Sequence, residues 1–97
     1  MDKDAFVIDI SRGGIGIGSP NEMVSEGDRV SVEIETLSSR ERWTLSGTVR
    51  HRNFDKSRRA WCFGVQFDRL ISEDDAMRIA KGVPLVSYRA LAASMAA

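Results

Sequence analysis

Residues 8–17 read IDISRGGIGI, and this stretch decides the fold because it joins two strand-like segments through a pair of glycines. Before and after the pair, apolar residues recur with a period of two, which is typical of a half-buried β-strand. Gly13-Gly14 is interpreted as a turn that needs positive φ and close backbone approach. We expect Asp9 and Ser11 to point outward together, opposite an apolar face. The side chains expected on that apolar face are Phe6, Ile8 and Ile10.

Three later segments repeat the alternation and predict further strands. They are residues 29–37, 43–49 and 61–67, in which every second side chain is apolar. Clusters of Gly, Ser, Asn and Asp separate these segments and indicate turns. Short alternating strands with turns between them are typical of an antiparallel barrel or sandwich. The chain is therefore interpreted as a single mainly β domain, residues 1–97, with its barrel over about residues 5–70.

The C-terminal part changes to a helical period, and a helical segment is expected over about residues 72–96. Ser72 precedes three acidic residues, which is typical of an N-cap and first turn. The apolar stripe expected to pack on the barrel consists of Ala76, Ile79, Ala80 and Val83. Gly82 is interpreted as the end of this helix and Pro84 as the start of a second one. The second helix would carry its stripe on Tyr88, Leu91, Ala92 and Met95.

The net charge over 97 residues is zero, but the charges are unevenly spread. Residues 1–39 hold three basic and eight acidic side chains, a net of −5, whereas residues 40–59 hold seven basic and two acidic, a net of +5. The middle of the chain is thus interpreted as an anion site or docking surface, or simply as a solvated strand face. Its candidate basic residues are Arg50, Arg52, Arg58 and Arg59.

A cytoplasmic, reducing location is expected for this chain. Its N-terminus lacks the basic-then-apolar layout of a signal peptide, and there is no long apolar run that would form a membrane segment. The single cysteine, Cys62, excludes an intramolecular disulfide and a cysteine-rich zinc site.

Enzyme chemistry is not indicated, and no metal or cofactor is expected. The one histidine, His51, has no second histidine or cysteine at the spacing of metal ligands. A dyad of Cys62 and His51 would need two strands to bring them together, so an inert thiol is the simpler interpretation. The glycines lack the Gly-Lys-Ser/Thr of a phosphate-binding loop. Nucleic acid is disfavoured as a partner because Trp43 and Trp61 align with the apolar faces.

Asp9, Ser11, Arg12 and Gly14 form the constellation that most suggests a ligand. A carboxylate can accept the N–H donors on the Watson–Crick edge of guanine, and a hydroxyl can complete the contact. A guanidinium can bridge guanine O6 and N7 or bind a phosphate. A glycine beside them lets the backbone approach the ligand. The same spacing also suits a plain turn, in which Asp and Ser bond to nearby backbone groups.

Four segments together resemble the PilZ domain, a bacterial module that senses cyclic di-GMP: VIDISRGGIGI, EGDRVSVEIE, LSGTVRHR and CFGVQFDRL. The family's Asp/Asn-x-Ser-x-x-Gly motif maps onto Asp9, Ser11 and Gly14. Its Gly-Val-x-Phe maps onto Gly64, Val65 and Phe67. The resemblance implies a six-stranded antiparallel barrel with a C-terminal helix, and a cyclic di-GMP site that includes the first motif and Arg12.

Nucleotide-binding PilZ domains also carry Arg-x-x-x-Arg upstream of the first motif, and the five residues before Phe6 contain no arginine. The resemblance therefore implies half a site and a barrel without its usual first strand, whose open edge would invite self-association or cover by a helix. The four basic residues of the middle region would substitute only if their hairpin folded toward Asp9. We expect a non-enzymatic regulatory module of PilZ type, cyclic di-GMP binding or derived from it, that acts by protein contact. The alternative is a degenerate adaptor that binds no nucleotide and works only through protein interaction or oligomerisation.

Overall fold

The computed structural model describes residues 5–21 and 24–91, and this part of the chain forms six strands and one helix. In chain order they are β1 (Phe6–Ile10), β2 (Gly14–Ser19), β3 (Arg29–Thr36), β4 (Arg42–Asp55), β5 (Ala60–Phe67), α1 (Glu73–Lys81) and β6 (Pro84–Ala90). Neighbouring strands are antiparallel, and their order in the sheet is β1-β2-β5-β4-β3-β6. The predicted mainly β fold with a C-terminal helix is therefore confirmed.

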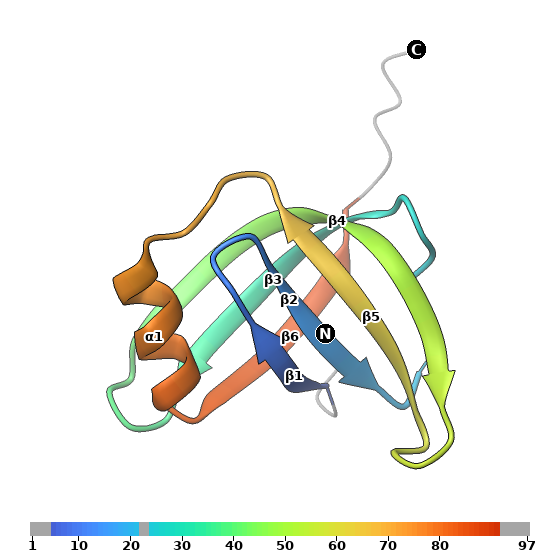
Figure 1. Cartoon of the computed structure of the whole chain (residues 1–97), viewed down its shortest axis with the longest axis horizontal. Helices are drawn as coiled ribbons and strands as arrows, with labels where there is room; N and C mark the ends of the chain where they lie inside the picture. The colour runs from blue at the N-terminus through green and yellow to red at the C-terminus, as the bar shows by residue number, and fades with distance from the viewer. Residues whose placement is uncertain (1–4, 22–23, 92–97) are drawn as a thin grey trace.

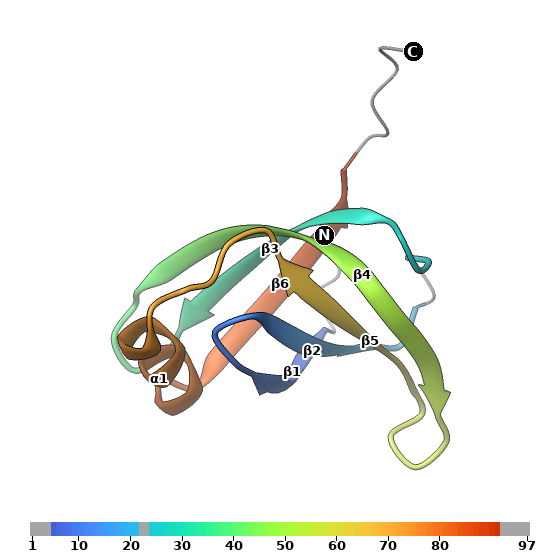
Figure 2. The same ribbon diagram turned by 45° about the horizontal axis from the view of Figure 1, so that its top comes forward.

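The sheet curls into an open half-barrel, as Figures 1 and 2 show. β1 and β6 form its edges, and within the described residues they approach each other without pairing. α1 packs against β1, β3 and β6, so a helix covers one end of the gap between the edges. Self-association through an edge stays a prediction. In residues 5–21 and 24–91, no helix has the length and apolar character needed to cross a membrane.

The inner face of the half-barrel is an apolar core. Alternate side chains of the strands point into it, as the period of two predicts. The buried members from β2, β3 and β5 are Ile15, Ile17, Val30, Val32, Ile34, Phe63, Val65 and Phe67. Phe63 meets Tyr88 of β6 edge-to-face, with ring centroids 4.9 Å apart. This contact joins strands from both halves of the sheet, so burial of apolar surface holds the curl.

Strand β1 departs from strict alternation. The register shifts between Val7 and Asp9, so Ile8 is an extra residue in a β-bulge. As a result Val7 and Ile10 pack against the core, whereas Ile8 and Asp9 both line the outer face. The expected core positions of Ile8 and of Phe6, which is 38% exposed, are wrong, and the outward position of Asp9 is confirmed. Alternation could not reveal the bulge, because Val7 and Ile8 suit either face.

The glycine pair does form the β1–β2 connection, closed by a hydrogen bond from the backbone N–H of Ser11 to the carbonyl oxygen of Gly14 at 2.9 Å. The expected positive φ at the pair is wrong: among glycines of the described residues, Gly27 alone has one, at 88°. Close backbone approach is confirmed instead. A Cβ on Gly14 would lie 2.4 Å from the carbonyl oxygen of Val65 on β5.

The predicted second helix is wrong, because residues 84–90 form strand β6, which pairs with β3 along its length. Val86 and Tyr88 are buried on the inner face, two positions apart as in any strand. Val83, with φ of 57°, reverses the chain directly after α1. Pairing with β3 and burial of two side chains outweigh the local helix preference. Leu91, also expected on the stripe, lies in no helix, and its backbone N–H donates to the carbonyl oxygen of Arg29 at 2.8 Å. Ala92 and Met95 lie outside the described residues.

Helix α1 is shorter than its predicted stripe. It begins after Ser72, whose Oγ accepts the backbone N–H of Asp75 at 2.9 Å, and it ends at Gly82, so both boundaries are confirmed. Ile79 is fully buried and Ala76 packs beside it. The other two expected stripe residues are exposed: Ala80 lies on the outward side of the helix, and Val83 follows the end of the helix.

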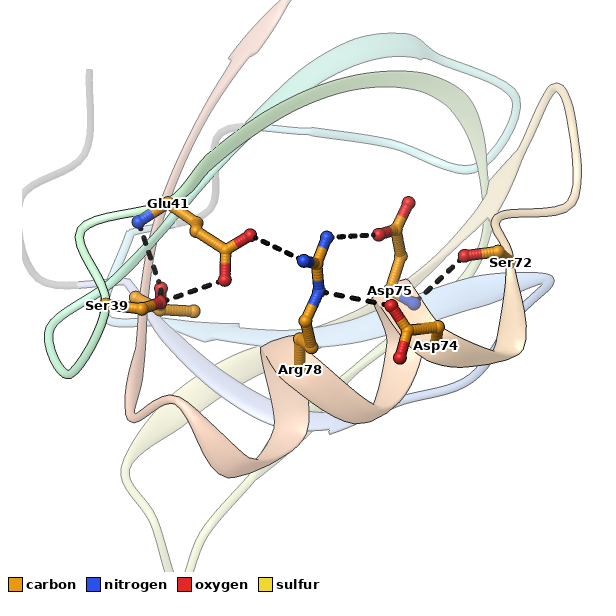
Figure 3. Close-up of polar contacts among 7 residues, drawn as sticks. Ser39, Glu41, Ser72, Asp74, Asp75 and Arg78 are labelled. Atoms are coloured by element: carbon orange, nitrogen blue, oxygen red, sulfur yellow. Dashed lines mark hydrogen bonds and ion pairs between the residues drawn. The ribbon is translucent and has the colours of Figure 1, made fainter.

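Arg78 ties the outer side of α1 to the β3–β4 turn (Figure 3). Its guanidinium donates to Asp75 at 2.9 Å and forms ion pairs with Glu41 at 3.0 Å and Asp74 at 3.4 Å. It also lies 5.9 Å from the ring centroid of Trp43. The hydrogen bond to Asp75 and these carboxylates raise the pKa of Arg78. The network is half exposed, so it orients the helix and adds little stability.

Replacing Ile79 by alanine should destabilise the domain by about 2–5 kcal/mol, because it leaves a cavity between α1 and the barrel. Urea unfolding followed by far-UV circular dichroism measures the change. The matched control is Met77→Ala on the exposed side of the same helix, which should change stability by no more than about 0.5 kcal/mol. Equal effects of the two substitutions would contradict the packing described here.

A second ion pair joins the start of β3 to the end of β5. Arg29 Nη2 donates to Asp68 Oδ2 at 2.7 Å, and Arg29 also donates to the hydroxyl of Thr48 at 3.2 Å. The hydrogen bond from Arg29 and then its charge lower the pKa of Asp68. Both side chains are nearly half exposed, so salt screens the pair.

Because the folded state lowers the pKa of Asp68, the pair contributes stability above the ordinary aspartate pKa and loses it as pH falls through the lowered value. Asp68→Asn should therefore lower the urea midpoint at neutral pH and converge with the parent as pH falls through the lowered pKa of Asp68. Urea unfolding of both proteins at low salt over a series of pH values tests this pH dependence. Glu26→Gln, which removes an exposed carboxylate, serves as the control. A constant difference at all pH values would contradict the assignment.

Candidate functional site

The outer face of β2 carries glycines. Ile15 and Ile17 of β2 point into the core, so the alternating positions Gly14, Gly16 and Gly18 face outward. Gly14 and Gly16 line the cavity described below, whereas Gly18 is buried beneath the ring of Phe6. On β5, Gly64 pairs with Gly16 and extends the strip of glycines. Because these glycines carry no Cβ, neighbouring side chains lie directly over this glycine floor: Asp9 over Gly16 and His51 over Gly64.

An open cavity of about 600 Å³ lies over this floor, within the usual range of small-molecule sites. One wall comes from β1 and the β1–β2 turn, and the opposite wall from the β4–β5 hairpin. The side chains that give the walls their chemistry are Asp9, Ser11, Arg50, His51, Asn53, Asp55, Arg58 and Gln66. Residues far apart in the sequence therefore meet here because β2 and β5 are paired in the sheet.

Two β-bulges aim the wall residues into the cavity. In β1 the bulge at Ile8 sends Ile8 and Asp9 to the outer face together. In β4 the register shifts between Val49 and His51, so Arg50 and His51 both line the cavity. Bulges re-aim side chains in this way because the extra residue breaks the alternation. The two lie on opposite sides of the glycine floor.

Asp9 is held in place through one of its two oxygens. Its Oδ1 accepts the backbone N–H of Gly16 at 3.1 Å, and a Cβ on Gly16 would lie 2.6 Å from the same oxygen. No other hydrogen bond to the Asp9 side chain occurs among residues 5–21 and 24–91, so Oδ2 faces the cavity free to accept. Ser11 is also exposed, and its hydroxyl lies 3.5 Å from the carbonyl oxygen of Gly14, too far for a strong bond.

Arg12, a predicted ligand residue, does not line this cavity. Its Nε donates to the carbonyl oxygen of Ile71 at 3.0 Å, and the backbone N–H of Ile71 donates back to the carbonyl oxygen of Arg12 at 2.9 Å. Arg12 instead fastens the β1–β2 turn to the segment that leads into α1. Of the four residues predicted from the motif, the structure brings Asp9, Ser11 and Gly14 to the cavity.

The four basic residues of the middle region divide between two sides of the hairpin. Arg50 and Arg58 line the cavity, where Arg50 Nε donates to Gln66 Oε1 at 2.7 Å and Arg58 Nη1 donates to Asp55 Oδ2 at 3.1 Å. Arg52 lies on the other side, 4.9 Å from the ring centroid of Trp61. Arg59 sits in the turn with φ of 52° and does not line the cavity.

Four polar residues of the cavity were not predicted as ligand residues from the sequence. His51 lies against Gly64, so close that a Cβ on Gly64 would be 2.4 Å from its Nε2. Asn53 and Asp55 follow it at alternate positions of β4, and Gln66 lies farther along β5, opposite Thr48. Alternation after Arg50 would have found the first three, if the bulge had been known. Among the described residues, no group of three or more His, Cys, Asp or Glu could hold a metal ion.

Comparison with known protein families gives one match. The sequence model of the PilZ domain family matches residues 4–83, which include all strands up to β5 and helix α1. No curated protein and no solved structure matches the chain. PilZ domains are regulatory modules without catalytic activity of their own, of the type that receives cyclic di-GMP.

The two adjacent glycines should respond differently to alanine. Gly14→Ala forces a Cβ against the backbone of β5, which cannot move aside, and should cost about 1–3 kcal/mol. Gly13→Ala has room, since the nearest atom is 3.6 Å away at the end of the Leu70 side chain, and should change stability by no more than about 0.5 kcal/mol. Urea unfolding of both variants measures this, and a larger loss for Gly13→Ala would contradict the register of β2.

Proposed function

The chain belongs to the PilZ domain family, and from that premise we propose that it is a non-enzymatic bacterial regulatory module that binds cyclic di-GMP. One observation carries the proposal. Asp9 and Ser11, the polar residues of the family motif, stand on the same wall of a cavity of about 600 Å³ whose floor contains Gly14, Gly16 and Gly64. Charged and hydroxyl groups with few partners of their own are suited to recognise a polar ligand.

The wall formed by Asp9 suits the edge of a guanine base. Guanine presents adjacent N–H donors on its Watson–Crick edge, and a carboxylate accepts such donors in charge-assisted hydrogen bonds. The bond from Gly16 fixes the carboxylate before a ligand arrives, so little side-chain entropy remains to be lost on binding. Ser11 adds a hydroxyl within the same wall. The glycine floor lets the flat base lie close to the sheet.

The same wall is connected to α1, which supports a relay by protein contact. The carbonyl oxygen of Gly13 accepts the backbone N–H of Phe67 at 2.9 Å, and Arg12 is bonded twice to Ile71 just before the helix. A ligand that draws Ser11 toward itself would pull on this turn and so on the start of α1. The signal would then reach a partner through the helix and its surroundings.

A nucleotide-free adaptor is the second candidate, and exposed apolar side chains favour it. Leu37 of the β3–β4 turn and Val83 are 51% and 59% exposed, and their backbones are hydrogen-bonded at 3.1 Å. Leu85 of β6, two residues after Val83, is 52% exposed. Such side chains suit a protein partner or a second copy. Nucleic acid is not proposed, since Trp61 already contacts Phe54 and Arg52.

The proposal places the module in the cytoplasm. A single cysteine, buried and unpaired, agrees with a reducing environment. Cyclic di-GMP is the one ligand proposed, and no cofactor is needed for its recognition.

Isothermal titration of the chain with cyclic di-GMP tests the proposed function. We expect saturable binding that weakens roughly ten- to hundredfold in Asp9→Ala, since a charge-assisted contact to the base is lost. Ser11→Ala should weaken it less. Glu26→Ala removes an exposed carboxylate outside the cavity and should leave affinity unchanged. Absence of binding up to high micromolar nucleotide would reject the proposal and favour the adaptor.

A further inference from the structure

We propose that Arg50 and Arg58 of the β4–β5 hairpin form the phosphate-binding wall of the cavity, and that Asp55 competes with the ligand phosphate for Arg58. The inference rests on the proposed function, because it names the second half of the same site. It assigns the anion contacts to residues that follow the family motif in the chain by about forty to fifty positions. It also makes the affinity of the site depend on a carboxylate inside the cavity.

The positions of the charges favour this division of the cavity. Asp9 stands on the β1 wall and repels phosphate, whereas Arg50 and Arg58 stand on the β4–β5 wall. The backbones of β1 and β4 are three strand spacings of roughly 4.8 Å apart, or about 14 Å along the sheet, with β2 and β5 between them. Arg50 reaches over β5 to Gln66, and Arg58 lies in the turn that follows β4. This distance leaves room for a base against one wall and a phosphate against the other. A guanidinium is the side chain that binds phosphate through two parallel N–H donors.

In the ligand-free chain both arginines have internal partners. Arg50 donates to the neutral amide oxygen of Gln66, a partner that a charged phosphate readily replaces. Arg58 is paired with Asp55, whose side chain is 25% exposed. That carboxylate therefore occupies the position of an anion on Arg58.

Asp55 is held charged and in place by the hairpin turn. Its Oδ1 accepts the hydroxyl of Ser57 at 2.6 Å, the backbone N–H of Ser57 at 2.9 Å and the backbone N–H of Arg58 at 3.3 Å. These hydrogen bonds, the Ser57 hydroxyl first, lower the pKa of Asp55, so it stays ionised at neutral pH. A phosphate that reaches Arg58 must displace or sit beside this negative charge. Asparagine at position 55 would keep the turn bonds to Oδ1 and remove the charge.

The hairpin supplies matched controls. Arg59 neighbours Arg58 in sequence and carries the same charge, but it does not line the cavity. If the hairpin acted only as a diffuse positive surface, loss of either residue would weaken binding alike. If Arg58 contacts phosphate directly, removal of Arg58 weakens ligand binding more than removal of Arg59.

Isothermal titration of the whole chain with cyclic di-GMP tests the inference, using Arg50→Gln, Arg58→Gln, Arg59→Gln and Asp55→Asn. We expect each of the first two to weaken binding roughly tenfold or more, and Arg59→Gln by less than about twofold. Asp55→Asn should strengthen binding several-fold, because Arg58 loses its internal competitor. Arg58→Lys should recover part of the loss, since it restores charge without the two-pronged geometry. Circular dichroism confirms that each variant is folded.

The outcomes separate this inference from the proposed function. If the parent chain binds cyclic di-GMP and Asp9→Ala weakens it, while Arg50→Gln and Arg58→Gln behave like Arg59→Gln, the phosphate wall is rejected and the proposed function stands. If Asp55→Asn binds no more tightly than the parent, the competition by Asp55 is rejected. If the parent chain binds no cyclic di-GMP, the inference falls together with the proposed function.

Discussion

The structure depends on one strand, β2, having side chains on one face and none on the other. Its inner residues Ile15 and Ile17 are buried among the other strands and help to hold the curled sheet together. Its outer positions are glycines, and at Gly14 even a methyl group would meet the backbone of β5. The pattern that builds the core is therefore also the pattern that clears the floor of the cavity. The alternating isoleucines and glycines of β2 therefore contribute both to the core and to the shape of the cavity.

The glycine floor matters because of the side chains that lie over it and on either side of it. Side chains from neighbouring strands lie over the glycines: Asp9 over Gly16 from β1, and His51 over Gly64 from β4. The two bulges put these side chains there, one at each side of the floor. Asp9 on one wall then faces Arg50, Arg58 and Asp55 on the other, and on this arrangement we base the proposal of a ligand with base-edge donors and phosphates. The turn that carries Ser11 is also fastened to α1, so the site is not isolated from the rest of the domain.

Much of the fold could be predicted from local pattern. The alternation in residues 29–37, 43–49 and 61–67 gave the strands and their inner faces, and Ser72 and Gly82 gave the boundaries of α1. The pattern failed where two periods fit equally well. Residues 84–90 satisfy a helical stripe and a strand alternation, and only pairing with β3 decides between them. It failed again at Ile8, since a bulge is fixed by how two strands meet and not by one strand's composition.

The candidate site, like the fold, could be predicted from the sequence only where it depends on local residue order. Asp9, Ser11 and Gly14 belong to a short motif, so the sequence by itself determined that they lie together before a tight connection between two strands. Only the tertiary structure decided which cations face them. Arg12 is adjacent in sequence yet bonded to Ile71, whereas Arg50 and Arg58 are about forty to fifty residues away and share the cavity. The physical reason is that strand pairing across β2 and β5, and a bulge in β4, set which side chains meet, and neither can be read from local residue order.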